Sequence, residues 1–388
     1  MSVRKRIWKN SKGEVREAWV VSYAKRDKDG KRKQHIETFE RKKDADARHD
    51  QIRTDIRSGT HIAPSESITV RAATELWLEA CQSRHLNSQT IAQYETHARI
   101  HIIPLIGEQR LSDLTLAGVR AFEDRMLLDR SGALVRKVLT SLSSAISDAQ
   151  ERGLVARNVV TDLRRNRRRK GGKASSRANG KLQAGVHIPT PQEITAIIQN
   201  ASPSCRVVIA VAAFTGLRAS ELRGLRWIDV DLKKRELHVR QRADRLNVIG
   251  APKSDAGTRT VPFGAPIAKI LSEHKLKSGG CELVFPNPEG AIVRLTSLVK
   301  GLKSACRRAG VVTPERKAKY TGLHCLRHFY ASWSINRVVD GGCGLPAKVV
   351  QERLGHANIS ITLDTYGHLF PRGDDSAILD AAEGALLG

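Results

Sequence analysis

Side chains that could carry out chemistry gather in the second half of the sequence, in four short boxes. Two boxes contain an arginine, three contain histidine, and the last contains a tyrosine. Guanidinium groups keep a permanent charge, and their forked donors match pairs of phosphate oxygens. A phenol becomes a nucleophile once a base accepts its proton. These residue types therefore suit chemistry at a phosphate ester; they are Arg218 in T-G-L-R-A-S-E-L, His324 and Arg327 in H-C-L-R-H, His356 in L-G-H and Tyr366 in D-T-Y-G-H.

Each box taken alone also has a structural interpretation. Arg218 and Glu221 are three residues apart, the spacing of an ion pair on one helix. His324 and His328 have the i,i+4 spacing with which a helix can bind a metal, but no accompanying Glu or paired Asp is present and H-E-x-x-H is absent. A G-x4-G-K loop followed by Ser or Thr is also absent, which argues against a nucleotide-driven enzyme.

The charge of the chain points to a polyanionic partner. The 388 residues include 66 Lys and Arg against 40 Asp and Glu, a formal net charge of +26. Nucleic acid is the first partner to consider for such an excess, and an anionic membrane surface is the second. The most apolar stretch, residues 207–214, is too short to span a membrane, and the basic start M-S-V-R-K-R leads into no hydrophobic signal region. We therefore expect a soluble, intracellular protein.

The cysteines do not indicate a zinc site. None of the six lies in a C-x2-C or C-x4-C spacing, which argues against zinc ribbons and fingers. Without a secretion signal, buried reduced thiols are the better interpretation.

Residues 1–64 predict a small module of three strands and a helix. Short β-prone runs at residues 7–8, 18–24 and 35–39 are separated by Gly-terminated turns at residues 10–13 and 27–30, which indicates an antiparallel meander. Residues 42–58 follow as a predicted helix, with Gly59 as its stop. The many basic residues favour a binding module, and a solvated basic surface is the alternative.

Residues 65–163 predict a helical bundle, because apolar residues recur at spacings of three and four after the Pro64–Ser65 break. Pro104 is expected between helices.

A basic segment follows, and we expect residues 164–188 to form a linker, with a nuclear localisation signal as the competing interpretation of the run. Its candidate DNA-binding residues are Arg164, Arg165, Arg167, Arg168, Arg169 and Lys170.

Residues 189–388 predict a mainly helical domain with a β-prone interlude at residues 236–241, 246–249 and 258–263. The predicted fold class is therefore a multidomain, mainly α protein. It has an amino-terminal three-stranded sheet with a helix, a helical bundle, and a mainly α domain that carries a small antiparallel sheet.

The four boxes, in this order and at these distances, resemble the tyrosine recombinase or phage integrase family over about residues 189–370. The upstream chain resembles the longer integrases, in which an arm-site DNA-binding module precedes a helical core-binding domain. The resemblance implies that residues 1–64 are the arm-site module, 65–163 the core-binding domain and 189–388 the catalytic domain with a tail.

Carried over residue by residue, the resemblance implies a six-residue catalytic set. Tyr366 would attack the phosphodiester, and the two arginines would bind its non-bridging oxygens. His324 would be the favoured general base and His356 a phosphate hydrogen-bond donor, with the reverse emphasis left open. Lys253, between β-prone runs, would protonate the leaving 5′ oxygen from a hairpin turn, although an exposed turn lysine is also the commonest kind. The set is Arg218, Lys253, His324, Arg327, His356 and Tyr366. Glu221 and His328 are interpreted as structural.

The family also implies a function and partners. We expect a site-specific integrase that exchanges DNA strands through a covalent 3′-phosphotyrosyl intermediate, with no metal or nucleotide cofactor. Its partners would be double-stranded attachment sites, three further copies of the chain in a tetramer and, in some systems, an excisionase and a DNA-bending host factor. It would act in the cytoplasm with the nucleoid. A metal-dependent nuclease and a non-catalytic DNA-binding regulator are the alternatives.

Overall fold

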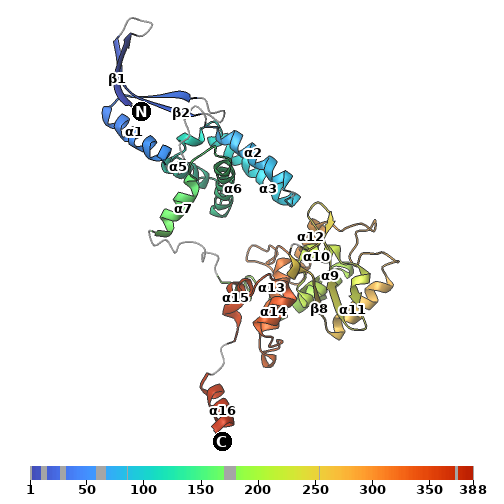
Figure 1. Ribbon diagram of the computed structural model, residues 1–388. Coiled ribbons are helices and arrows are strands. Elements are labelled where there is room, and N and C mark those ends of the chain that lie inside the picture. Colours follow the sequence, from blue (N-terminus) through green and yellow to red (C-terminus); the bar gives the residue numbers. More distant parts are fainter. Residues whose placement is uncertain are drawn as a thin grey trace. The chain divides into compact units, whose positions relative to one another are not determined.

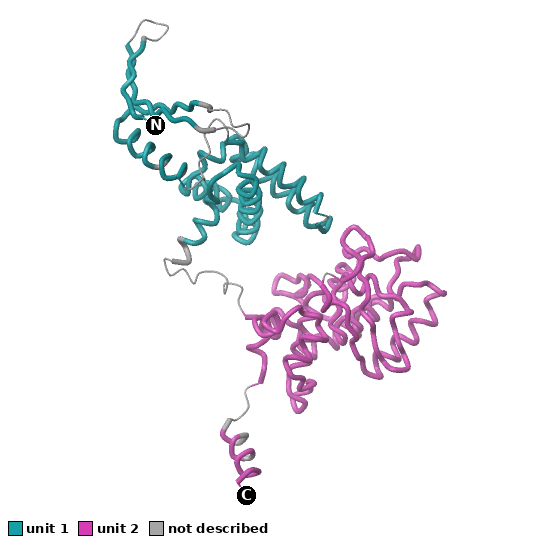
Figure 2. The backbone as a smooth tube through the Cα atoms, viewed as in Figure 1, with its two compact units in different colours: residues 1–176 teal, residues 177–388 magenta. Residues whose placement is uncertain are grey.

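The computed structural model describes residues 2–9, 15–26, 32–57, 67–84, 86–169, 181–252, 254–371 and 375–387. The chain divides into two compact units, residues 1–176 and 177–388, which are coloured separately in Figure 2. The turns expected at residues 10–13 and 27–30, the helix stop at Gly59 and the break at Pro64–Ser65 lie outside the described residues.

The first unit begins with the predicted meander. Strands β1 (Ser2–Lys9), β2 (Val15–Arg26) and β3 (Arg32–Phe39) pair antiparallel in that order. Helix α1 (Lys42–Arg57) lies beside the sheet (Figure 1). It packs Ala45 and Ile52 against Val21 and Tyr23 of β2. The alternation of β2 places these apolar side chains on one face of the sheet.

The helices that follow form the predicted bundle: α2 (Val70–Ser83), α3 (Ser88–His97), the π-helical turn Ala98–Ile102, α4 (Ile103–Ile106), α5 (Leu116–Leu127), α6 (Gly132–Glu151) and α7 (Val159–Arg169). Leu142 and Ile146 of α6 are buried in its core with Phe122. The expectation for Pro104 was wrong, because it lies inside a continuous helical stretch. The π-helical turn before Pro104 shifts the backbone hydrogen bonds from i→i+4 to i→i+5 pairing, close to the point where proline has no N–H to donate.

The basic segment is not a linker along its whole predicted length. Helix α7 extends through Arg169 because Val159, Val160 and Leu163 anchor its first turns in the bundle core. At the other end, Ile188 is buried in the core of the second unit. The predicted bounds of 164–188 are therefore too wide, while Lys170 and residues 171–180 lie outside the described residues.

The second unit is mainly helical. Figure 1 shows α13, α14 and α15 together, and they pack on one another. Its helices are α8 (Pro191–Gln199), α9 (Pro203–Thr215), α10 (Ala219–Gly224), α11 (Ala265–Leu276), α12 (Leu295–Arg308), α13 (His324–Ile335), α14 (Ala347–Leu354), α15 (Ile359–Tyr366) and α16 (Asp375–Leu387).

The predicted β interlude forms two small antiparallel sheets. Strands β4 (Val230–Asp231), β5 (Glu236–Val239) and β8 (Arg259–Pro262) form one sheet, and β6 (Arg242–Ala243) pairs with β7 (Ile249–Gly250) in the other. The runs on either side of residues 252–255 therefore belong to different sheets. The prediction of a hairpin between these runs was wrong, because β8 pairs with β5 and β7 pairs with β6.

The predicted fold class is confirmed: a mainly helical chain with small antiparallel sheets. The core of the second unit combines helix α9 with the β5–β8 pair and with α12 and α13, through residues such as Val211, Leu237, Val261, Leu302 and Leu326. Among the described helices, none is both long and apolar enough to cross a membrane.

Candidate active site

A cavity of about 320 Å³ in the second unit collects the chemical residues. Its walls come from the start of α10, the first turns of α13, the end of α14 and helix α15. Five of the six predicted catalytic residues line it: Arg218, His324, Arg327, His356 and Tyr366. Ser254 also lines the cavity, whereas its neighbour Lys253 lies outside the described residues.

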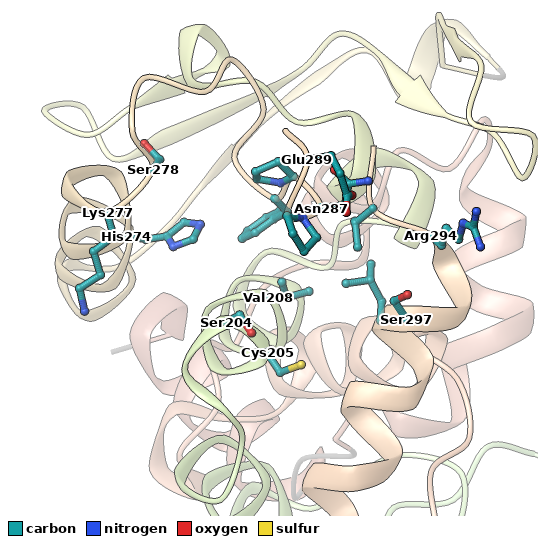
Figure 3. Close-up of a pocket in the computed structure, with 15 residues that line it drawn as sticks. Ser204, Cys205, Val208, His274, Lys277, Ser278, Asn287, Glu289, Arg294 and Ser297 are labelled. Atoms are coloured by element: carbon teal, nitrogen blue, oxygen red, sulfur yellow. The ribbon is translucent and has the colours of Figure 1, made fainter. Parts of the chain in front are cut away.

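A larger cavity, of about 760 Å³, lies elsewhere in the same unit. In Figure 3, Ser204, Cys205 and Val208 of α9 form one side, with His274 of α11 and Arg294 around them. The lining contains neither the four boxes nor the tyrosine, and much of it is apolar. The composition of the walls, not the size of the cavity, identifies the smaller one as the candidate site.

Arg218 is held by a buried carboxylate. It is the N-cap of α10, and its backbone N–H donates to Glu221 Oε2 over 2.8 Å while its Nη1 donates to Glu221 Oε1 over 2.8 Å. Arg259 of β8 donates to both Glu221 oxygens, over 3.1 and 2.9 Å. Burial alone would raise the pKa of Glu221, but the bonds and charges of the two arginines bring it below its ordinary value.

Arg327 is buried and bound by carbonyl groups at two helix ends. Its Nη1 donates to Gly216 O over 2.8 Å, and its Nη2 donates to Leu354 O. Burial lowers the pKa of Arg327 to about 9, which still leaves the guanidinium charged at pH 7. Gly216 has a φ of 63°, and a Cβ there would meet the Tyr330 ring at 2.4 Å. The glycine of the T-G-L-R box is thus a backbone requirement.

Gly355 has the corresponding position at the end of α14. Its φ is 65°, a Cβ would lie 2.7 Å from Ala256 O, and its carbonyl accepts from Arg218 Nη2 over 3.1 Å. The next residue, His356, is thereby turned into the cavity, with its Nδ1 2.9 Å from Thr362 Oγ1. A hydroxyl can donate to Nδ1, and this arrangement leaves Nε2–H available to donate to a ligand.

Tyr366, at the end of α15, is only 1% exposed. Its hydroxyl lies 2.8 Å from Nδ1 of His328, and its ring stacks on that of His356 with an interplanar angle of 5°. Burial raises the pKa of Tyr366 to about 12, against the opposing charges of Arg327 and Arg218. A phenol held in this state needs a proton acceptor before it can attack.

The histidines around the tyrosine are kept neutral. Burial, followed by the charge of Arg327, lowers the pKa of His356 to about 4. Burial and the neighbouring His324 lower the pKa of His328 to about 4. His324 keeps an exposed edge, yet the protein around its ring, with Arg327 and Arg218, lowers its pKa as well. At pH 7 the site therefore combines fixed guanidinium charge with neutral imidazoles.

This arrangement suits a phosphate ester attacked by an oxygen nucleophile. Two guanidinium groups can hold the non-bridging oxygens, and preorganised donors stabilise the charge that develops on them. Within the described part of the chain, no group of three or more His, Cys, Asp or Glu side chains is arranged to hold a metal ion.

Sequence reasoning missed three residues around this cavity. Arg259 and Thr362 gave no signal, since each lies outside the four boxes. His328 was interpreted as structural, although its ring contacts the hydroxyl of Tyr366. The interpretation of Glu221 as a brace for Arg218 agrees with its bonds, and the predicted ion pair is formed.

The candidate DNA-binding residues of the basic segment lie in the first unit. Arg164 and Arg165 are exposed on α7, and Arg164 Nη2 donates to Thr140 Oγ1 over 2.8 Å. The backbone of Arg167, Arg168 and Arg169 is helical, but their side chains lie outside the described residues. Lys170 lies outside them entirely.

Comparison with known proteins gives two family matches. Residues 189–372 match the phage integrase family, and residues 69–127 match the phage integrase N-terminal SAM-like domain. Together the matches span more than half of the chain.

Similar proteins cover most of the chain. A "Tyrosine recombinase XerC-like" protein of Caldanaerobacter subterraneus subsp. tengcongensis is 27% identical over 87% of this chain and 88% of its own length. The integrase of Mycobacterium phage L5 is 25% identical over 84% of this chain and 85% of its own.

Solved structures share the fold. The Tn1549 transposon integrase in complex with transposon right end DNA has a TM-score of 0.64 at 21% identity, covering 83% of this chain and all of that chain. A lambda integrase tetramer bound to a Holliday junction has a TM-score of 0.56 at 18% identity, over 91% of this chain and 96% of that one.

The carboxylate of Glu221 is predicted to be a major source of stability in the second unit. Glu221→Gln leaves two neighbouring guanidinium groups without their counter-charge, and we expect a loss of about 3 kcal/mol in the free energy of unfolding. Urea unfolding at pH 7 measures this. The matched control is Glu352→Gln on α14, whose carboxylate is 60% exposed beside Lys348 and should contribute less than about 1 kcal/mol.

The difference between wild type and Glu221→Gln should depend on pH. Because the folded-state pKa of Glu221 is below its unfolded value, its contribution is complete above the unfolded pKa of about 4.3 and is lost as pH falls through the folded pKa. The two unfolding curves should therefore converge in acid. A difference that stays constant from pH 7 to pH 3 would contradict this account.

Proposed function

Because the chain belongs to the phage integrase family, we propose that its arginine, histidine and tyrosine cluster cleaves and rejoins DNA through a covalent 3′-phosphotyrosyl bond. The protein is a tyrosine-type site-specific DNA recombinase, and we propose double-stranded DNA as its substrate. In the proposal, recombination at attachment sites integrates or excises a mobile element. The observation that carries it is the meeting of Arg218, Arg327 and the buried Tyr366 at one cavity.

The proposed reaction assigns a role to each part of the cavity. Arg218 and Arg327 bind the non-bridging oxygens, and His356 donates from Nε2 to the same phosphate. Tyr366 Oη attacks phosphorus, and the bond to the 5′ oxygen breaks. Lys253 supplies the proton to that oxygen. His324, at the exposed rim, joins the phosphate-binding group or serves as base. The new ester keeps the energy of the broken one, so rejoining needs no nucleotide.

Further copies of the chain complete the proposed assembly. The lambda integrase, similar in fold, was solved as a tetramer on a Holliday junction. We propose the same number of protomers here, acting on two DNA partners, with an excisionase and a DNA-bending host factor as accessory proteins. The reaction would take place in the cytoplasm, on the DNA of the nucleoid.

The proposal also assigns functions along the chain. Residues 1–64 would bind arm sites, residues 65–163 and the basic segment would bind the core site, and residues 189–388 would cleave it. The exposed Arg164 and Arg165 support a backbone-tracking role for the basic segment, because guanidinium groups on a helix reach phosphates without reading bases.

A metal-dependent nuclease and a non-catalytic regulator remain as alternatives that an experiment can separate. A nuclease has no need of a tyrosine between neutral histidines, and a regulator has no need of Tyr366 at all. Both alternatives predict DNA without a covalent protein adduct, whereas the proposed reaction forms one.

Tyr366→Phe should abolish the covalent protein–DNA adduct, since phenylalanine keeps the ring and removes only the attacking oxygen. The measurement is a denaturing gel of protein mixed with a duplex carrying the attachment site, identified from the junctions of the element with its host DNA, in excess EDTA. The variant should still bind the duplex. Tyr94→Phe, in the first unit, is the control and should form the adduct. An adduct from Tyr366→Phe, or cleavage that requires added Mg²⁺, would refute the proposed chemistry.

Lys253→Ala is predicted to slow cleavage by a factor of about 10² to 10⁴, the usual loss when a general acid is removed. An alkoxide needs a proton as it leaves, whereas a thiol, with a pKa of about 8.5, departs as a thiolate unaided. The variant should therefore cleave almost normally when sulfur replaces the 5′-bridging oxygen. Arg218→Ala should gain nothing from the sulfur. Equal defects of Lys253→Ala on both substrates would leave the general acid unidentified.

Removal of residues 2–64 should leave core-site cleavage intact and abolish binding to a distal arm site. The salt dependence of binding should also become shallower, by about 0.9 in the logarithmic slope for each phosphate that the shortened chain no longer neutralises. Filter binding at several salt concentrations measures both. An unchanged slope with distal binding retained would assign the module another function.

A further inference from the structure

The hydrogen bond between His328 and Tyr366 is the part of the cavity that the roles above do not use. His328 lies on α13, one turn after His324, and its Nδ1 is 2.8 Å from Tyr366 Oη. The rings face each other at an angle of 64°, with centroids 5.7 Å apart. The side chain that contacts the attacking oxygen is therefore not one of the six predicted catalytic residues.

The other two histidines are less well placed for the tyrosine hydroxyl. His356 lies parallel to the tyrosine ring at a centroid distance of 6.4 Å, and its Nδ1 is occupied by Thr362. His324 lies beyond His328, with ring centroids 4.4 Å apart, and keeps its exposed edge. Among the described side chains, His328 makes the hydrogen bond to Tyr366 Oη.

The surroundings of His328 keep its imidazole neutral, so that one ring nitrogen has a free lone pair. Its ring is half-buried, and the groups that face it are His324 and Arg327 on its own helix, Tyr366 of α15, and His187 from the segment before α8. Burial, His324, Arg327 and His187 all lower the pKa of His328. With the proton on Nε2, Nδ1 offers a lone pair to the Tyr366 hydroxyl.

We propose that His328 is a catalytic residue that takes the proton of Tyr366 as that oxygen attacks the phosphodiester. The proposal rests on the function proposed above and refines it by naming the base. One bond forms, from Tyr366 Oη to phosphorus, and one breaks, from phosphorus to the 5′ oxygen. The phenol proton moves to Nδ1 of His328, and the leaving oxygen receives a proton from the general acid, assigned above to Lys253. In rejoining, the imidazolium returns its proton to Tyr366.

This assignment separates the work of the two histidines on α13. His324, at the rim beside Arg218 and Arg327, is left to contact the phosphate. His328 acts on the nucleophile alone. Because the proton acceptor is already hydrogen-bonded to the phenol before DNA binds, no side chain has to move into place when Tyr366 attacks.

The test uses His328→Asn in the full chain, because the asparagine amide reaches about as far as Nδ1 and can hold the phenol but cannot accept its proton. Adduct formation on the attachment-site duplex should slow by about 10² to 10⁴-fold at pH 7, with DNA binding unchanged. The rate of the variant should then rise roughly tenfold per pH unit between pH 6 and pH 8, as hydroxide replaces the missing base. His328→Gln, with its amide farther out, repeats the test if the asparagine variant unfolds.

A more acidic nucleophile distinguishes a base from a residue that only positions the ring. A ring-fluorinated tyrosine introduced at position 366 in His328→Asn should restore most of the missing rate, because its phenol ionises without help. The same replacement in Arg327→Lys should restore none. His238→Asn is the matched control: its Nδ1 also lies close to a hydroxyl, Thr260 Oγ1 at 3.0 Å, but on β5 and away from the cavity. It should cleave like wild type.

The possible results distinguish a failure of the role proposed for His328 from a failure of the proposed function. Wild type without an adduct would overturn the proposed function itself. A wild-type adduct together with a normal rate in His328→Asn would overturn only the role of His328. A slow variant with a flat pH profile and no recovery from the fluorinated tyrosine would also overturn it, since that pattern belongs to a residue that merely orients Tyr366.

Discussion

The structure depends on holding guanidinium groups at a cavity wall before any phosphate is there to neutralise them. Arg327 is buried, and Arg218 points into the same cavity, so their mutual repulsion must be balanced within the protein. The balance comes from two sources. Glu221 pairs with Arg218 and Arg259, and the carbonyl groups of Gly216, Leu354 and Gly355 accept the remaining bonds. Those carbonyls lie at the carboxyl ends of α9 and α14, where a helix carries partial negative charge.

The same solution explains why glycine occurs in two of the boxes. At the ends of α9 and α14, the chain must turn sharply in the left-handed region so that a carbonyl faces an arginine and the next residues enter the cavity. The T-G-L-R and L-G-H patterns therefore encode helix termination as much as chemistry. His356 is directed inward because Gly355 precedes it, and Arg218 becomes a helix cap because Gly216 ends the helix before it.

Much of the fold and most of the cavity could be predicted from the sequence. Alternating and helical apolar patterns give the meander of residues 2–39 and the bundle, and the order of the boxes brings five of the six predicted residues to one cavity. What failed depends on partners far away in the chain. No local pattern says that β8 pairs with β5, that Leu163 anchors α7 beyond Arg164, or that His328 faces Tyr366 across 38 residues. Side-chain direction on α13 is decided by the packing of α13, α14 and α15.

One hydrogen bond in the second unit joins a residue near its start to the turn that follows Tyr366. His368, two residues after Tyr366, donates from Nε2 to the carbonyl of Leu182 over 2.7 Å, and His187 of the same entering segment influences His328. Residues 182–187, near the start of the second unit, are thus hydrogen-bonded to the turn that follows the tyrosine and place the His187 imidazole near the hydrogen-bond partner of that tyrosine. An isolated catalytic fragment that began at Pro189 would lack both features, although it would include all four boxes. The compact second unit therefore begins upstream of the segment that its motifs define.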